Sequence, residues 1–443
     1  MINVGVSAGF HDAAISVLNG REILYANHCE RYSKIKGDPN FNPNLLPLHY
    51  DNTAFYEKPF LKNTRRLFAG QRMKWPDRKY DYYFGHHETH AAAGYYTSPF
   101  NECNVLVIDA IGEWNTISIW EGKDDKLTKL KTWNYPYSLG LLYSAITRRI
   151  GLKPNEDEYI TMGMAAFGEP KYDLEYLLHK NNHRGVGKIF PRAHPNDLAA
   201  SVQNLYETKF LELLKYCDYS NIVIMGGCAL NCVANSKIPN RFNVWIMPSP
   251  GDAGSSLGAA ALIEKKKIRW RHPYLGHNII KELNPKEIVK HLLEHKLCGV
   301  ANGRAEFGPR ALGNRSLLAD PRLDIKDTVN EVKQRQKFRP FAPAILEEHF
   351  DDYFVGRKNK YMQFVSKARH DYKSVTHVDG TARVQCVEKD NISILRPILE
   401  EWYSQTGCPM LLNTSLNIRG KPMVNNITHA ENFEKKYNVK VFR

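Results

Sequence analysis

The chain has 443 residues, of which 43% are hydrophobic and 24% are charged, and its formal net charge is +14. These values are typical of a globular protein of two or three domains and exclude a disordered chain. No apolar run reaches the roughly 18 residues that a membrane helix needs, and the start, MINVGVSAGF, predicts a strand and not a signal peptide. Eight scattered cysteines without a CxxC pair indicate free thiols, so we expect a soluble cytoplasmic protein.

Three strands are predicted in the first 28 residues, with the loop AGFHD after the first strand and an Asn19-Gly20 hairpin turn after the second. The same layout returns at residues 104–133, where NVLVID, TISIW and LTKLKTW are the strands. Each copy is an apolar strand, a small-residue loop with an Asp, and a hairpin. This internal repeat predicts two related sheet units.

Two further apolar strands end in glycine-rich loops, within NIVIMGGCALN (221–231) and VWIMPSPGDAGSS (244–256). Loops of this kind at helix starts present backbone N–H groups to phosphates. With residues 7–12 and 109–113 they make four such loops, which favours a nucleotide cleft. The alternative is that some of them are only tight turns.

A basic, proline-containing stretch at residues 264–285 predicts a domain boundary, and PKEIVKHLLEHK after it predicts an amphipathic helix. We therefore expect one domain at residues 1–275 and a second at 281–443. From Lys281 to Arg443 there are 28 basic and 20 acidic residues, so the basic excess concentrates in the second domain. Such a field suits anionic partners, although it is equally compatible with a lysine-rich surface.

The segment GHHETHAAAGYY (85–96) places His86 and His90 four residues apart, the spacing that brings two imidazoles to one face of a helix. Spacing alone more often reflects a surface accident. Asp109, which ends a strand, and Asp252, in PGDAG, are carboxylates that strengthen the case. Two His and two Asp predict a transition-metal site, with Fe(II) or Mn/Mg as the ion.

Arginine-rich loops with glycine and proline follow in the second domain: GRAEFGPRALGNRS (303–316), KQRQKFRPFAP (333–343), THVDGTARVQ (376–385) and LLNTSLNIRGKP (411–422). A solvated surface would also be basic, but partly apolar loops favour converging phosphate ligands. The candidate anion ligands from these loops are Arg304, Arg310, Lys333, Arg339, Arg383, Asn413, Asn417 and Arg419, and Arg315 lies among them.

The order of these motifs resembles that of the O-carbamoyltransferase family of antibiotic-tailoring and nodulation enzymes. The matching pieces are GFHDAA, HHETHAAAG, VIDAIGEW, MGMAAFGEP, GGCALNCVANSKI, SPGDAGSSLGAA, EFGPRALGNRSLLADPR, FRPFAPAIL, HVDGTARVQ and LLNTSLNIRG. The resemblance implies an α/β fold with two domains. The first would be similar to threonylcarbamoyl transferases, of the actin/Hsp70/sugar-kinase class with duplicated sheet units. The second would be similar to threonylcarbamoyl-adenylate synthases.

The resemblance also implies a reaction. The second domain would make carbamoyl-adenylate from carbamoyl phosphate and ATP, with Mg accompanying ATP, and the first would pass the carbamoyl group to a hydroxyl. His86, His90, Asp109 and Asp252 match iron ligands. Adenylate contacts are implied for Gly226, Gly227, Asn231, Gly251 and Ser255. Lys333 and Arg339 match residues that hold carbamoyl phosphate and ATP phosphates, with Arg383, Asn417 and Arg419 as further members.

A base for the acceptor hydroxyl is suggested by position alone at His11 or Asp12 in the first loop. For His11 the alternative is a structural hydrogen bond to the loop backbone. The chain departs from the family at residues 159–163, where Gly-Lys is usual before MGLA, and at Ala110, where Gly is usual.

The sequence does not identify the molecule whose hydroxyl accepts the carbamoyl group. Aromatic and basic residues interleave at residues 63–87 and 265–272, a pattern that can stack bases and neutralise phosphates. This favours a hydroxymethylated pyrimidine in DNA or a nucleotide, and a sugar or antibiotic hydroxyl is the alternative. A sugar-kinase-type ATP-dependent kinase and a nucleic-acid-binding protein with an inactive site are the rival classes. No membrane partner is expected, and a homodimer is left open.

Overall fold

The computed structural model describes residues 1–443, which form two compact units. Unit 1 comprises Met1–Ala26 and Pro39–Arg271, and unit 2 comprises Asn27–Asp38 and His272–Arg443. The chain thus enters unit 2 early, returns to unit 1, and leaves it for good after Arg271. The sequence led us to expect one domain at residues 1–275 and a second at 281–443. That division does not include the early segment Asn27–Asp38 that belongs to unit 2.

Unit 1 contains two five-stranded sheets with the same connectivity. The first has the order β3-β2-β1-β4-β5, and the second has the order β10-β9-β6-β7-β8. In each, the first strand pairs antiparallel with the second and parallel with the fourth. The bounds are β1 Ile2–Ser7, β2 Ala14–Asn19, β3 Glu22–His28, β4 Asn52–Phe55, β5 Tyr82–Tyr83, β6 Glu102–Gly112, β7 Asn115–Lys123, β8 Lys126–Asn134, β9 Asn221–Met225 and β10 Asn243–Trp245. The internal repeat predicted from the sequence is confirmed.

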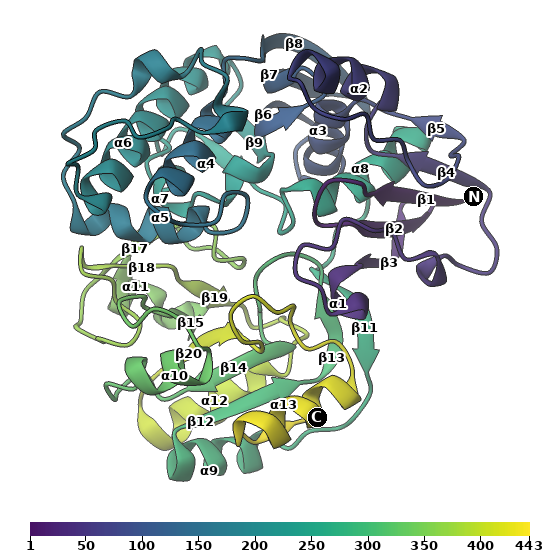
Figure 1. The fold of residues 1–443 in the computed structure, drawn as a ribbon. Helices are drawn as coiled ribbons and strands as arrows, with labels where there is room; N and C mark the ends of the chain where they lie inside the picture. Colours follow the sequence, from purple (N-terminus) through teal and green to yellow (C-terminus); the bar gives the residue numbers. More distant parts are fainter. The chain divides into compact units, whose positions relative to one another are not determined.

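Two buried helices connect the sheets of unit 1: α8 (Asp252–Glu264) packs on β1 and β2, and α3 (His86–Thr97) packs on β6 and β9. The two helices also pack on each other (Figure 1). Their small residues permit this, since a Cβ on Gly258 would lie 1.8 Å from the backbone oxygen of Thr89. Duplicated sheets around such a helix pair give the α/β fold of the actin, Hsp70 and sugar-kinase class.

The remaining helices of unit 1 lie outside this helix pair. Helix α4 (Leu139–Arg149) packs on β6 and on α6 (Pro195–Leu213), and α6 also contacts α5 (Glu158–Met164) and α7 (Cys232–Asn235). Helix α2 (Pro59–Phe68) follows β4. The ends of β6 and β9 and the starts of α3 and α8 meet in one region, where Asp109 contacts Gly227 and His86, and His86 lies near Asp252.

Unit 2 is built on a six-stranded sheet with the order β19-β15-β20-β14-β12-β21. The strands are β12 Leu297–Ala301, β14 Arg315–Ala319, β15 Ala342–Leu346, β19 Gln385–Val387, β20 Met410–Ser415 and β21 Val441–Phe442. Alternate residues of one strand serve opposite faces: Cys298 and Val300 join a cluster with α9 and α12, and Leu297 and Ala301 join one with α13. Helices on both faces therefore bury the sheet (Figure 1).

The helices of unit 2 include the predicted amphipathic one, which is α9 (Pro285–His295). The others are α1 Glu30–Ser33, α10 Lys326–Val332, α11 Phe350–Tyr353, α12 Leu395–Thr406 and α13 Ile427–Tyr437. Two small sheets complete the unit: β11 (Tyr274–Ile279) with β13 (Gly303–Glu306), and β16 (Phe354–Val355), β17 (Ser366–Ala368) and β18 (Thr381–Ala382). All eight cysteines are free thiols. None of the chain's helices combines the length and the apolar character needed to cross a bilayer.

Candidate functional site

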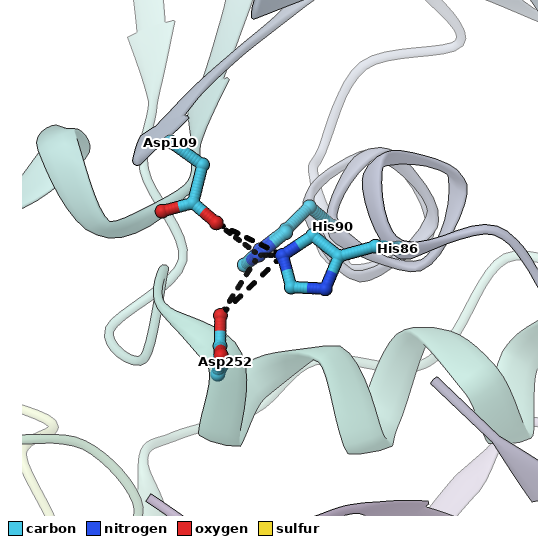
Figure 2. Close-up of side chains that lie close together, drawn as sticks. All are labelled: His86, His90, Asp109 and Asp252. Carbon is cyan, nitrogen blue, oxygen red and sulfur yellow. Dashed lines mark hydrogen bonds and ion pairs between the residues drawn. The ribbon is translucent and has the colours of Figure 1, made fainter. Parts of the chain in front are cut away.

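Four side chains from three elements converge in unit 1 (Figure 2). His86 and His90 lie on the first turns of α3, Asp109 near the end of β6, and Asp252 at the first position of α8. The β6–β7 pairing is irregular between Ile108 and Gly112, which is where Asp109 leaves the regular ladder. The four residues that the sequence proposed as metal ligands are thus brought together and buried.

The donor atoms of this cluster have the spacing of ligands around one ion. Nε2 of His86 lies 2.9 Å from Oδ2 of Asp109 and 3.6 Å from Oδ1 of Asp252. Nε2 of His90 lies 3.6 Å and 3.4 Å from the same two oxygens, and 3.2 Å from Nε2 of His86. Ligands bonded at about 2.1 Å to one transition metal lie roughly 3.0–3.4 Å apart. The donor set and its spacing therefore fit a divalent cation.

The charges of the cluster compensate one another. Burial lowers the pKa of His90, but hydrogen bonds to Asp109 and Asp252 outweigh that effect and raise it to about 9. Although burial would raise the pKa of Asp109, bonds from His86 and His90 bring it well below its ordinary value. The pKa of Asp252 is lowered in the same way, against burial, by the charges of His86 and His11. Without a cation, a proton on His90 offsets one of the two carboxylate charges.

The glycine loop after β9 holds the second oxygen of Asp109. The backbone N–H of Gly227 donates to Oδ1 of Asp109 at 3.2 Å, which leaves Oδ2 for the histidines. Gly226 precedes it with a φ of 92°, and a Cβ there would lie 2.2 Å from the backbone oxygen of Ile108. The glycine pair is therefore needed for the loop to approach β6 so closely.

Glu113 fixes the start of α3 and was missed as a site residue by sequence reasoning. Its Oε1 accepts the backbone N–H of His86 at 3.3 Å and that of Lys58 at 2.6 Å. Burial raises the pKa of this carboxyl, against the lowering effect of those bonds. Its position in the second loop of the repeat, corresponding to Asp12 in the first, was the available signal.

His11 and Asp12 lie beside Asp252. Nδ1 of His11 is 3.0 Å from Oδ2 of Asp12, and its Nε2 is 4.0 Å from Oδ2 of Asp252. Burial lowers the pKa of His11, but Asp252 and Asp12 raise it to about 9. Both side chains are partly exposed, so this pair borders the cluster where a substrate can reach it.

His87 faces away from the cluster, as its position between the two ligands predicts. Its Nδ1 lies 2.8 Å from Oγ of Ser118 in β7, and burial lowers its pKa well below the ordinary value. His87 is therefore a neutral side chain of the core.

The other nucleotide-loop candidates of unit 1 differ in their surroundings. Asn231 caps α7 by accepting from the backbone N–H of Ala234 at 3.0 Å, and its amide exchanges hydrogen bonds with Gln203. Gly251 directly precedes α8. Ser255 is fully buried in α8, and its Oγ has no hydrogen-bond partner. Asn231 thus has a structural task whatever else it binds.

In unit 2, Lys333 and Asn417 form the centre of a second group. Nζ of Lys333 donates to Oδ1 and to the backbone oxygen of Asn417, each at 2.9 Å, and contacts Ser415. Burial lowers the pKa of Lys333 well below its usual range, and the charges of Arg335 and Arg339 add to this. The backbone N–H of Arg419 donates to the backbone oxygen of Lys333 at 2.9 Å, so both loops meet here.

The other candidate ligands of unit 2 lie on neighbouring elements. Arg304 is in β13, and its Nε donates to the backbone oxygen of Gly276 at 3.3 Å. Arg310 follows in the next loop and is half-buried. Asn413 is buried in β20 and donates to Gln385 at 2.7 Å. Arg383 is half-buried, and its Nε is buried without a hydrogen-bond partner.

Arg315 is held by the protein itself. It is fully buried, and its guanidinium donates to the backbone oxygens of five residues. These are Asn302, Gly303, Asn314, His277 and Asn425. Burial lowers its pKa to about 10. Its place in an arginine-rich loop suggested a phosphate ligand, but the structure gives it a role in the fold.

Comparison with known proteins covers both units. The family model described as carbamoyltransferase N-terminus matches residues 51–190 and 180–261, and the one described as carbamoyltransferase C-terminus matches residues 289–442. Nodulation protein NolO of Bradyrhizobium diazoefficiens is 31% identical over 412 residues, which cover 78% of this chain and 75% of NolO. A protein of Synechocystis sp. is 29% identical over 95% of this chain and 92% of its own length.

Among solved structures, the activator of 2-hydroxyisocaproyl-CoA dehydratase from Clostridium difficile covers 60% of this chain and 96% of its own, with 13% identity and a TM-score of 0.39. The family assignment depends on the sequence matches, which extend over both units and confirm the resemblance seen in the motifs. The chain belongs to the carbamoyltransferase family and is a transferase.

Proposed function

We propose that this protein is an ATP-dependent O-carbamoyltransferase that makes carbamoyl-adenylate in unit 2 and transfers the carbamoyl group at the cluster of unit 1. The observation that carries the proposal is the convergence of His86, His90, Asp109 and Asp252 next to the glycine loop of β9. The matches to both carbamoyltransferase family models favour carbamoyl transfer over phosphorylation of a sugar.

The proposed reaction balances with one water. Water releases phosphate from carbamoyl phosphate and leaves carbamate, whose oxygen attacks the α-phosphorus of ATP while pyrophosphate departs. The acceptor hydroxyl then attacks the carbamoyl carbon, the bond between this carbon and the adenylate oxygen breaks, and AMP leaves. The hydroxyl proton passes to a base. The products are phosphate, pyrophosphate, AMP and the carbamoylated acceptor.

In unit 1 the four-residue cluster would hold the cation, with Fe(II) or else Mn or Mg as its identity. Such an ion would supply Lewis-acid polarisation of the carbamoyl oxygen or of the adenylate phosphate. The base is assigned to the His11–Asp12 pair. In this pair Nδ1 of His11 lies 3.0 Å from Oδ2 of Asp12, so the Asp12 carboxylate can accept the hydroxyl proton with the imidazole beside it.

In unit 2 the proposed task is to stabilise negative charge during adenylation, with Mg accompanying ATP. Lys333 and Arg339 are the proposed phosphate ligands, and Arg304, Arg310, Arg383, Asn413, Asn417 and Arg419 are proposed to complete the site. The low pKa that burial and Arg335 impose on Lys333 supports this assignment, because an anion would relieve that electrostatic penalty. The glycines of the unit 1 loops and Ser255 are proposed to contact the adenylate.

The test is product analysis with carbamoyl phosphate, ATP and a panel of hydroxyl acceptors, using His90→Ala and Lys333→Met as a matched pair. His90→Ala is expected to release pyrophosphate but transfer no carbamoyl group, whereas Lys333→Met is expected to release none. Formation of ADP without pyrophosphate would contradict the proposal and indicate a kinase. The panel includes hydroxymethylated pyrimidine DNA, nucleotides, sugars and aminoglycosides.

A further inference from the structure

One surface of unit 1 combines exposed aromatic rings with arginines that have no carboxylate partner. It comprises Arg66, Phe68, Arg72, Trp75, Arg148 and Arg184, which we call the aromatic–basic surface. Phe68 and Trp75 are 72% and 57% exposed. None of the four arginines forms an ion pair with a carboxylate, unlike Arg269 and Arg271 elsewhere in the unit, which both pair with Glu22.

The members of this surface are joined by contacts. Nε of Arg66 donates to the backbone oxygen of Arg72 at 2.6 Å, which folds the segment after α2 back on the helix. A Cβ on Gly70 would lie 3.2 Å from Nη2 of Arg184, and one on Gly185 would lie 3.6 Å from Cδ of Arg148. Segments near residues 66–75, 148 and 184 therefore form one continuous patch.

The aromatic–basic surface borders the metal cluster. The ring of Phe68 lies 5.5 Å from that of Trp114, and Nε of Arg65 donates to the backbone oxygen of Glu113 at 3.0 Å. Glu113 in turn accepts the backbone N–H of His86. The Glu113–Trp114 pair thus links the ring of Phe68 to the start of the helix that carries the histidines.

We propose that the aromatic–basic surface binds a strand of nucleic acid and presents one of its nucleotides to the transfer site. Arginines recognise phosphates and exposed rings stack on bases, so the two residue types together match both parts of a nucleotide chain. An acidic protein would need no stacking rings, and a lipid surface would not need arginines placed on three separate segments. The inference rests on the proposed function, since it names nucleic acid as the class of acceptor.

The experiment measures binding of a fluorescein-labelled single-stranded DNA, about 20 nucleotides long, to the full chain by fluorescence anisotropy. ATP and carbamoyl phosphate are absent, so the result does not depend on transfer. Phe68→Ala with Trp75→Ala is expected to weaken binding about tenfold or more. Arg66→Gln with Arg72→Gln and Arg184→Gln is expected to lower the slope of log affinity against log salt by about 2.

A matched control removes three exposed lysines from other parts of unit 1, with Lys126→Gln, Lys129→Gln and Lys215→Gln together. It is expected to bind DNA nearly as well as the parent chain. Equal losses in the control and the arginine variant would overturn the proposal, as would parent-level binding by the aromatic variant. Tighter binding to vesicles of anionic phospholipid than to DNA would indicate a membrane surface instead and also overturns it.

A second measurement uses the unaltered protein and so does not depend on variant folding. Photo-crosslinking of an iodouracil-containing oligonucleotide is expected to label peptides that contain Phe68 or Trp75, and labelling confined to other peptides would contradict the proposal. Absence of pyrophosphate release from ATP and carbamoyl phosphate would instead contradict the proposed function. The two failures are therefore distinguishable.

Discussion

Asp12 and Glu113 occupy the same place in the two sheets of unit 1, each two residues before the second strand and each with a left-handed backbone, at φ of 52° and 54°. Each also lies beside the start of a helix that carries metal-ligand candidates. Glu113 accepts the backbone N–H of His86, and Asp12 pairs with His11 next to Asp252. The duplicated loop thus supplies one acid to each helix of the pair.

Removing the acid at the second loop is expected to loosen the metal cluster. Glu113→Ala leaves the N–H groups of His86 and Lys58 without their acceptor, so metal affinity should fall by about 10- to 100-fold and the free energy of unfolding by about 1–3 kcal/mol. Glu113→Gln keeps an accepting oxygen, so its metal affinity should lie between that of the parent chain and that of Glu113→Ala. Metal titration by calorimetry measures the affinity. Glu121→Ala, in the same sheet, is the control, and an unchanged affinity in Glu113→Ala would refute the assigned role.

The glycine that ends β6, next to Glu113, gives a steric test of the same site. A Cβ on Gly112 would lie 2.1 Å from Cδ2 of His86, so Gly112→Ala must displace the imidazole. We expect the metal content measured by mass spectrometry to drop to a small fraction of the parent value. Gly20→Ala is the control, since its Cβ meets no atom within 4 Å and only its φ of 56° is unfavourable. Metal content equal to that of the parent would show that His86 is not a ligand.

Metal binding is expected to strengthen as pH rises. In the metal-free protein the carboxylates raise the pKa of His90 from 6.5 to about 9, so its proton stabilises the fold fully below 6.5 and less as pH approaches 9. A cation must displace this proton, which predicts about a tenfold gain in affinity per pH unit between those values. Titrations across that range, repeated with His11→Asn because His11 has a pKa of about 9 as well, measure the slope. A flat profile would contradict a proton on His90.

Most of unit 1 could be predicted from the sequence because its signals are local. Apolar runs bounded by small residues marked the strands, and their recurrence marked the duplication that the two sheets confirm. The early excursion of Asn27–Asp38 into unit 2 has no such signal, because long-range packing decides it. His28 shows this: its Nε2 accepts the backbone N–H of Gly308, a partner 280 residues away.

The convergence of the four metal-ligand candidates could be anticipated where residue type and spacing were sufficient, and their role as ligands stays a prediction. His86 and His90 share a helix face by their spacing, and two carboxylates at loop starts were the natural partners. Glu113 was missed because its contribution depends on a hydrogen bond to a backbone N–H, which composition does not reveal. Arg315 was grouped with phosphate ligands for the opposite reason, since a charged side chain in a glycine-rich loop gives no hint that carbonyl groups surround it.

Arg315 is expected to contribute to stability and not to ligand binding. Its buried guanidinium satisfies the backbone oxygens of five residues, and Arg315→Met would leave those acceptors without donors. The free energy of unfolding should fall by about 3 kcal/mol or more. Arg369→Gln, at an exposed arginine of the same unit, should change it by about 0.5 kcal/mol at most. Denaturant titration measures both, and a stable Arg315→Met variant would return Arg315 to the ligand candidates.

Substitution of Lys333 is expected to stop formation of carbamoyl-adenylate without disturbing the metal cluster, so it separates adenylation from carbamoyl transfer. Its ammonium group is buried among oxygens of Ser415 and Asn417, and burial and neighbouring arginines lower its pKa, so a phosphate is the partner that its environment lacks. Lys333→Met removes the donors at similar volume but leaves the oxygens of Ser415 and Asn417 without their partner, so a denaturant titration accompanies the assay to show that the variant is folded. Pyrophosphate release should fall by about 100-fold or more.

Lys333→Arg should not restore pyrophosphate release, because the larger planar guanidinium does not fit the contacts of a compact ammonium group. Metal content should stay at the parent level in both variants, since the cluster belongs to unit 1. Lys337→Met, at an exposed lysine paired with Glu331, is the matched control and should release pyrophosphate normally. Pyrophosphate release at the parent rate by Lys333→Met would show that Lys333 is not needed to form carbamoyl-adenylate. It would contradict the assignment of this step to the Lys333 site of unit 2.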